Sequence, residues 1–259
     1  MALEHRPKMI VAGTTSYPRR LEPEPFKAIA DEVGALMMFD IAHIAGLVAG
    51  GVHPNPVPFA DVVTFTTHKT LRGPRGGCIL SSAAHAAAID KAVFPGSQGG
   101  PLEHAVAAKA VAFHEAMQPS FKVYAQQIIT NASALAEALA HQGFRLVSGG
   151  TDTHMMVVDL RPFDSELTGK EAQLVLDQAG ITLNKNNIPN DPRSPFVTSG
   201  VRIGVPSVTT QGMTQTEMPL IAEYIATTLR GRNDPAIVAD VRAKVAALCA
   251  KFPVYTKRA

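Results

Sequence analysis

Apolar residues are arranged differently in the two parts of this chain. Up to residue 100, short apolar runs without polar alternation predict strands that are buried on both faces. Beyond residue 100, apolar residues recur at helical spacing in alanine-rich stretches. The predicted strands are 9–12, 35–39, 62–65, 78–80, 144–147, 155–160 and 200–204, and the predicted helices are 25–33, 101–117, 121–141, 170–178, 218–229 and 236–251.

Strands that alternate with crossovers are typical of an open α/β sheet, which we expect for the first part of the chain. The mixture of helices and strands after residue 119 predicts a small α+β domain. We therefore expect two domains, residues 1–119 and 120–259, with no internal repeat.

Two polar residues follow strands of the first part. Asp40 ends the apolar run 35–39, and Lys69 follows the run 62–65. Ligands of open α/β sheets bind at the carboxyl ends of strands, so both side chains should face one crevice. Pyridoxal phosphate needs a lysine amine for its aldehyde and a carboxylate for its pyridine nitrogen. For an arbitrary pair, a solvated lysine and a turn-forming aspartate are the ordinary alternative.

Two glycine-rich stretches follow the lysine. The stretch 73–77, Gly-Pro-Arg-Gly-Gly, predicts a tight path into a buried strand at 78–80. The stretch 94–101, Phe-Pro-Gly-Ser-Gln-Gly-Gly-Pro, predicts a loop that opens a helix and offers backbone N–H groups to a phosphate. Such loops occur in many proteins, so this pattern alone does not identify a ligand.

In this order, the motifs Asp-x-Ala-His, His-Lys-Thr-Leu-x-Gly-Pro-Arg-Gly-Gly and Phe-Pro-Gly-x-Gln-Gly-Gly-Pro resemble the serine hydroxymethyltransferase family, and the resemblance runs from Lys8 to Tyr255. It implies a partial aspartate-aminotransferase-like large domain (pyridoxal-phosphate fold type I) and a C-terminal small domain. It also implies a homodimer that converts L-serine and tetrahydrofolate into glycine and 5,10-methylenetetrahydrofolate. Family members carry an N-terminal region ahead of the point where this chain begins, so we expect a truncated form.

The resemblance assigns five residues to the cofactor and the reaction. Lys69 matches the lysine that forms a Schiff base with pyridoxal phosphate, and Asp40 matches the partner of the pyridinium nitrogen. His43 would sit near the cofactor's phenolic oxygen and the substrate carboxylate. Thr66 and His68 flank the lysine and would lie beside the cofactor. A lone histidine is more often structural, but the Asp-x-Ala-His match favours a site role for His43.

The resemblance also assigns five further positions. Thr15 would keep a hydroxyl next to the cofactor, and Gly99 and Gly100 match a loop that a neighbouring subunit sends to the cofactor phosphate. Arg202 matches the arginine that binds the amino-acid carboxylate, a task suited to its planar fork. Asn186 matches a residue that hydrogen-bonds the pteridine of tetrahydrofolate.

Some positions depart from the family pattern. Residues 15–18 read Thr-Ser-Tyr-Pro, where the family usually has Ser-Ala-Tyr-Ser or Ser-Ala-Tyr-Pro. Val205 replaces a usual threonine and loses a hydroxyl near the carboxylate site, and Phe65 stands where another threonine is common. The absent N-terminal region would carry the catalytic glutamate and the histidine that stacks on the cofactor. The sequence therefore leaves open a working hydroxymethyltransferase, a non-catalytic fragment that binds the cofactor weakly or pairs with another subunit, and threonine aldol cleavage with the same cofactor.

Composition narrows the remaining classes of function. A net charge of +2 and the absence of a Lys/Arg-rich cluster with aromatic residues argue against nucleic-acid binding. The two cysteines, Cys78 and Cys249, have no paired spacing, which predicts buried free thiols and no metal site. The chain shows neither a signal-peptide pattern nor an apolar run of membrane-spanning length, so we expect a cytoplasmic protein without a membrane partner.

Overall fold

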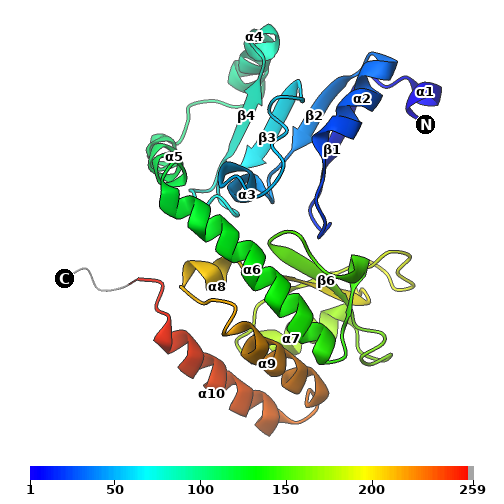
Figure 1. Cartoon of the computed structure of the whole chain (residues 1–259), viewed down its shortest axis with the longest axis vertical. Helices are drawn as coiled ribbons and strands as arrows, with labels where there is room; N and C mark the ends of the chain where they lie inside the picture. Colours follow the sequence, from blue (N-terminus) through cyan, green and yellow to red (C-terminus); the bar gives the residue numbers. More distant parts are fainter. Residues whose placement is uncertain (256–259) are drawn as a thin grey trace. The chain divides into compact units, whose positions relative to one another are not determined.

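The computed structural model describes residues 1–255. The chain divides into two compact units, residues 1–15 with 20–126, and residues 16–19 with residue 127 onward. Both units combine helices with a four-stranded sheet, so the protein is a mixed α/β structure (Figure 1). Within residues 1–255, no helix has the length and apolar character needed to cross a membrane.

The sheet of the first unit has the strand order β1-β2-β3-β4. Strands β1, β2 and β3 run parallel, and β4 is antiparallel to β3. All four strands predicted from apolar runs are present, and no end differs by more than one residue. Their bounds are β1 (Met9–Gly13), β2 (Leu36–Asp40), β3 (Val62–Thr66) and β4 (Gly77–Ser81).

Helix α2 (Pro23–Val33) packs along β1 and β2 (Figure 1). Proline is favoured in the first turn of a helix, and Gly34 ends this helix in the left-handed conformation with φ 69°. The buried side of the helix presents Ala30 and Phe26, whose ring meets that of Phe39 edge to face at 6.0 Å. This contact covers one face of the sheet near β2.

The prediction that the apolar strands are buried on both faces is wrong for this sheet. Val11 is 65% exposed, and Ile79 and Leu80 are 46% and 44% exposed. Within the described residues β1 and β4 are edge strands, so part of their apolar surface has no neighbouring strand or helix to cover it. The thiols also differ from expectation, because Cys78 is only partly buried and Cys249 is exposed.

The helices of the first unit include several that the apolar pattern did not predict. Three are short, and one π-helical turn overlaps the first part of the predicted glycine-rich loop. The helix after this loop begins at Glu103 rather than at residue 101. Helix α6 (Pro119–His141) is long and continues into the second unit. The others are α1 (Ala2–His5), α3 (Ala45–Ala49), α4 (Ala83–Lys91), the π-helical turn (Ala92–Ser97) and α5 (Glu103–Ala116).

The sheet of the second unit is antiparallel throughout, in the order β5-β6-β8-β7. All five residues of its strand β6 are buried. The strand β7 and the helix α8 were not predicted, because each is short. The bounds are β5 (Arg145–Leu146), a 3-10 turn (Val147–Gly149), β6 (Met155–Asp159), α7 (Gly169–Gln178), β7 (Asn184–Asn186), β8 (Gly200–Gly204), α8 (Pro206–Thr210), α9 (Met218–Arg230) and α10 (Pro235–Lys251).

Candidate functional site

Asp40 is the last residue of β2, and its carboxylate is oriented by two donors. Oγ1 of Thr64, its register partner on β3, donates to it at 2.6 Å, and the backbone N–H of Ala42 donates at 2.9 Å. The neighbouring strand approaches closely, because a Cβ on Gly13 would overlap with the Asp40 carbonyl group. The carboxylate is thus fixed at the sheet edge with lone pairs left for a further proton donor.

Lys69 lies in the turn that follows β3, between two buried threonines. Thr67, which is 0% exposed, donates to the carbonyl oxygen of Pro74 at 2.5 Å. Thr70, which is 2% exposed, donates to the carbonyl oxygen of His43 at 2.9 Å and accepts from the N–H of Gly46 at 3.0 Å. The backbone on both sides of Lys69 is therefore fixed, while no hydrogen bond to its ammonium group is found within residues 1–255.

The predicted cofactor residues lie at this same edge of the sheet. Thr66 Oγ1 donates to the carbonyl oxygen of Ala42 at 3.3 Å, and Nδ1 of His68 accepts from the N–H of Gly76 at 3.4 Å. His43 is partly buried and is joined to the lysine turn through Thr70. Hydrogen bonds from Thr66, at the end of β3, and from Thr70, in the turn after it, thus connect this part of the chain with the segment after β2.

The remaining cofactor residues are more exposed. Thr15 lies two residues beyond the end of β1 and is exposed. Gly99 and Gly100 are also exposed, and a Cβ at either position would meet no atom within 4 Å. No close approach within the described chain requires glycine at these two positions, so their assignment to a phosphate remains a prediction.

Arg202 and Asn186 come together in the second unit, on the neighbouring strands β8 and β7. The hydroxyl group of Ser16 donates to Asn186 Oδ1 at 2.9 Å and accepts from a guanidinium nitrogen of Arg202 at 3.4 Å. The other terminal nitrogen of Arg202 donates to Asn184 Oδ1 at 3.3 Å. Burial lowers the pKa of the Arg202 guanidinium, because the charged form is partly desolvated. An anion bound here would offset that desolvation.

The loop between β7 and β8 is fastened by one carboxylate. Asp191 accepts from the hydroxyl and the N–H of Ser199 at 2.7 and 2.9 Å, from the N–H of Arg193 at 3.0 Å and from the N–H of Ile188 at 3.3 Å. Burial by itself would raise the pKa of Asp191, but these hydrogen bonds outweigh it and lower the pKa to about 2. The loop that joins the strands of Asn186 and Arg202 is therefore tied at both ends.

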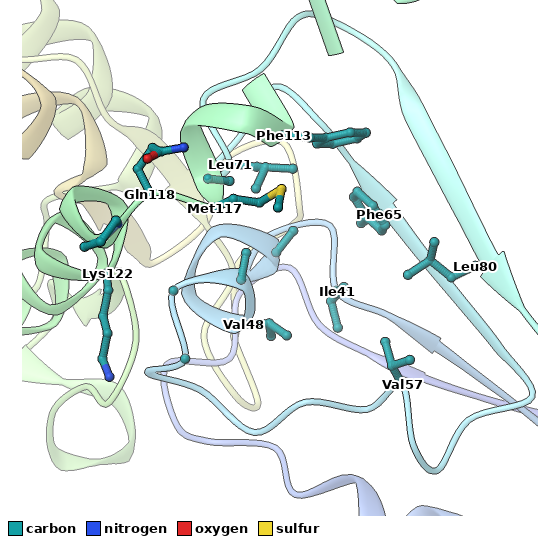
Figure 2. A pocket seen from close by; sticks show the side chains of 16 residues that line it. Ile41, Val48, Val57, Phe65, Leu71, Leu80, Phe113, Met117, Gln118 and Lys122 are labelled. Atoms are coloured by element: carbon teal, nitrogen blue, oxygen red, sulfur yellow. The ribbon is translucent and has the colours of Figure 1, made fainter. Parts of the chain in front are cut away.

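An apolar groove of about 730 Å³ also lies in the first unit (Figure 2). Phe65, Leu80, Phe113 and Met117 line it, and Lys122 at its rim points away from them. Phe65 lies between Thr64 and Thr66 on β3, so strand alternation directs it away from the two threonines. Phe65 is thus a lining residue of the groove rather than a member of the polar edge.

The first unit is a mixed α/β structure in which an aspartate and a lysine lie at the carboxyl ends of two adjacent parallel strands. The family model described as serine hydroxymethyltransferase matches residues 1–225. The chain therefore belongs to the serine hydroxymethyltransferase family, as the sequence motifs predicted.

Two curated relatives named serine hydroxymethyltransferase support this membership. The protein of Myxococcus xanthus (strain DK1622) is 57% identical over 258 residues, which is 100% of this chain and 61% of the relative. The protein of Polynucleobacter necessarius subsp. necessarius (strain STIR1) is 57% identical over 255 residues, 98% of this chain and 61% of the relative. The chain thus spans 61% of the length of these relatives.

The sequence did not indicate three residues that organise these groups. The apolar pattern places Thr64 in a strand, but its contact with Asp40 depends on a register that apolar runs do not give. Thr70 stands next to Lys69 in the motif, which is a usable indication of a structural role. Ser16 lies in a motif that departs from the family pattern, but the sequence does not indicate that its hydroxyl bridges Asn186 and Arg202.

Asp191 should make the protein sensitive to acid. Its folded-state pKa of about 2 lies below the ordinary 3.8. The stabilisation is therefore fully present above pH 3.8 and is lost as the pH falls through about 2. We expect the free energy of unfolding, measured with urea from about pH 5 to about pH 2, to fall less steeply in Asp191→Asn than in the wild type. Asp177→Asn, at an exposed position of α7, serves as the control. Equal slopes in all three proteins would contradict the role of Asp191.

Proposed function

We propose that this chain carries the lysine, the ring-nitrogen partner and the amino-acid carboxylate site of a pyridoxal-phosphate-dependent serine hydroxymethyltransferase. The reaction would convert L-serine and tetrahydrofolate into glycine and 5,10-methylenetetrahydrofolate. One observation carries the proposal: the hydrogen bonds of Thr64 and Thr70 join the segments that bear Asp40 and Lys69 at one sheet edge.

The side chains at this edge fit the two ends of the cofactor. Asp40 has two donors and retains acceptor capacity for the proton of a pyridinium nitrogen. Lys69 presents an amine on a fixed backbone, in reach of a ligand at the carboxyl ends of the strands. The phosphate group of the cofactor would be bound by Gly99 and Gly100 of a neighbouring subunit, so we also propose a homodimer.

Each residue would then perform a defined task. Pyridoxal phosphate, when bound, supplies an electron-withdrawing ring that stabilises negative charge on the α-carbon of the amino acid. Asp40 would keep the proton on the ring nitrogen, and Lys69 would hold the cofactor by its aldehyde carbon. His43, Thr66 and His68 would orient the cofactor from the segments on either side, and Thr15 would add a hydroxyl beside it.

The second unit would bind the substrates. Arg202 would bind the serine carboxylate through two charge-assisted hydrogen bonds, because its guanidinium is partly desolvated and its fork matches a carboxylate. Asn186 would bind the pteridine of tetrahydrofolate, with its amide oriented by Ser16. Val205 is fully buried, and its aliphatic side chain has no hydroxyl to offer the carboxylate.

We propose that the architecture is a partial aspartate-aminotransferase-like large domain, residues 1–119, followed by a C-terminal small domain, residues 120–259. The change from a largely parallel to a wholly antiparallel sheet supports this division. The expected cytoplasmic location stays a prediction from composition.

A second candidate function is a non-catalytic chain that binds the cofactor weakly or pairs with another polypeptide. The exposed apolar groove and the exposed residues on the edge strands favour it, since such surfaces mark interaction sites. The chain also spans 61% of its relatives, so residues that complete their sites can lie in the part it does not match. Threonine aldol cleavage remains a weaker alternative that would make less use of Asn186.

Lys69 should carry the cofactor. In protein saturated with pyridoxal phosphate, borohydride reduction followed by peptide mapping should find the label on Lys69, because this partly exposed lysine follows β3 at the carboxyl end of the sheet. Lys91, exposed at the end of α4, provides the internal reference. Labelling spread evenly over both lysines, or its absence from Lys69, would show that the cofactor is held elsewhere.

Arg202 should determine the affinity for the amino-acid carboxylate. In an assembly that binds serine, we expect Arg202→Ala to weaken serine binding by about 2 to 4 kcal/mol, because a desolvated charge pair is broken. Arg202→Lys should recover little of this loss, since the planar fork is missing. Calorimetric titration with serine measures both effects, and Arg242→Ala, an exposed position on α10, is the control. Wild-type affinity in both Arg202 variants would assign the carboxylate to another cation.

The chain alone should not turn over serine with tetrahydrofolate. We expect turnover only when the segment of the Myxococcus relative that this chain does not match is supplied, because acid–base groups and substrate positioning each contribute orders of magnitude in rate. Serine-dependent formation of glycine, measured with and without that segment, tests this expectation. Full turnover by the unsupplemented chain would favour a self-sufficient enzyme.

A further inference from the structure

Arg72 adopts a backbone conformation that is unusual for its residue type. Its φ is 59°, in the left-handed region that an arginine enters at a cost in free energy that glycine does not pay. The residue is exposed, so burial of its own side chain does not account for this conformation. Contacts around Arg72 must offset the cost.

The left-handed turn at Arg72 closes the loop that bears Lys69. The N–H of Arg72 donates to the carbonyl oxygen of Lys69 at 3.0 Å, and the N–H of Gly73 donates to the carbonyl oxygen of Thr67 at 2.7 Å. The first bond is made by Lys69 itself, and the second joins residues on either side of Lys69 in the chain. The position of the Lys69 backbone therefore depends on the conformation of residue 72.

The side chain of Arg72 lies on two aromatic rings of α6. Its guanidinium carbon is 3.9 Å from the ring centroid of Tyr124 and 5.6 Å from that of Phe121. Both rings are buried, and their centroids are 5.4 Å apart. A guanidinium on the face of a ring is attracted by the quadrupole of the ring, and this attraction strengthens where water is excluded.

Helix α3 completes a closed set of contacts between the lysine turn and α6. A Cβ on Gly46, in α3, would overlap with the backbone of Thr70, and a Cβ on Gly50, the residue after α3, would overlap with the side chain of Ala125 in α6. Each approach therefore requires glycine. The lysine turn contacts α3, the residue that follows α3 contacts α6, and Arg72 joins α6 directly back to the turn.

We propose that Arg72 is a positioning residue, which fixes the backbone of Lys69 through its cation–π contact with Tyr124 and Phe121. The contact and the turn exist independently of any ligand. Only the expected effect of Arg72 on cofactor binding rests on the proposed function of Lys69. Arg72 would act through the turn and would not touch the cofactor.

Amide hydrogen exchange tests the link between Arg72 and the turn. We expect Arg72→Ala to accelerate exchange at Gly73 about fivefold, as loss of one such contact permits, and Arg72→Lys to retain part of the protection because a cation remains over the ring. Tyr124→Leu should accelerate the same amide, and adding Arg72→Ala to it should have little further effect. Arg6→Ala is the matched control, because Arg6 is also exposed and left-handed, with φ 44°.

Selective labelling separates positioning from general stability. With pyridoxal phosphate and borohydride at a temperature well below unfolding, Arg72→Ala should lower the ratio of label on Lys69 to label on Lys91, and Arg72→Lys should restore part of it. An unchanged ratio, or faster exchange spread equally over β2 and the turn, would overturn the proposal. If the wild type shows no preference for Lys69, the cofactor role fails, and exchange at Gly73 still decides whether Arg72 fixes the turn.

Discussion

The first unit depends on hydroxyl groups that join the ends of two parallel strands. Thr64 binds the carboxylate at the end of β2, and Thr70 binds two backbone groups in the segment that follows. Both threonines belong to β3 or the turn after it, so β3 and its turn orient the Asp40 carboxylate at the end of β2 and the segment that follows it. Because buried hydroxyl groups lose free energy when unpaired, these bonds fix one geometry rather than a range of them.

The role of these hydroxyl groups explains which parts of the site could be predicted from the sequence. Asp40 and Lys69 could be located because apolar runs end next to them, and strand ends in an open α/β sheet converge at one edge. The partner of Asp40 could not be predicted, because Thr64 lies opposite Asp40 only in the register that forms when the two strands pair. Short helices such as α3 were missed for a related reason: the close approach of Gly46 to Thr70, and not helical periodicity, places that helix.

The second unit shows how a departure from a family motif can acquire a contact. The motif at residues 15–18 reads Thr-Ser-Tyr-Pro, with serine at a position where the family pattern usually has alanine. In the structure this serine hydroxyl donates to the Asn186 amide oxygen and accepts from the Arg202 guanidinium, so it connects the two side chains. The sequence revealed the substitution but not its partners, because they lie 170 and 186 residues away.

Successive side chains of strand β3 point alternately to a polar and to an apolar environment. Thr64 and Thr66 serve the polar edge, whereas Phe65 between them lines the apolar groove. A threonine at residue 65 would leave a hydroxyl facing Leu80 and Phe113 without a partner from the polar edge, so phenylalanine suits the surroundings in this chain. The burial pattern expected from the apolar runs was wrong for a physical reason: a run of apolar residues favours burial, but it does not tell whether a neighbouring strand or helix covers both faces. Phe65 and the two threonines therefore lie on opposite faces of one strand, and a single strand contributes both to the apolar groove and to the polar group around Asp40.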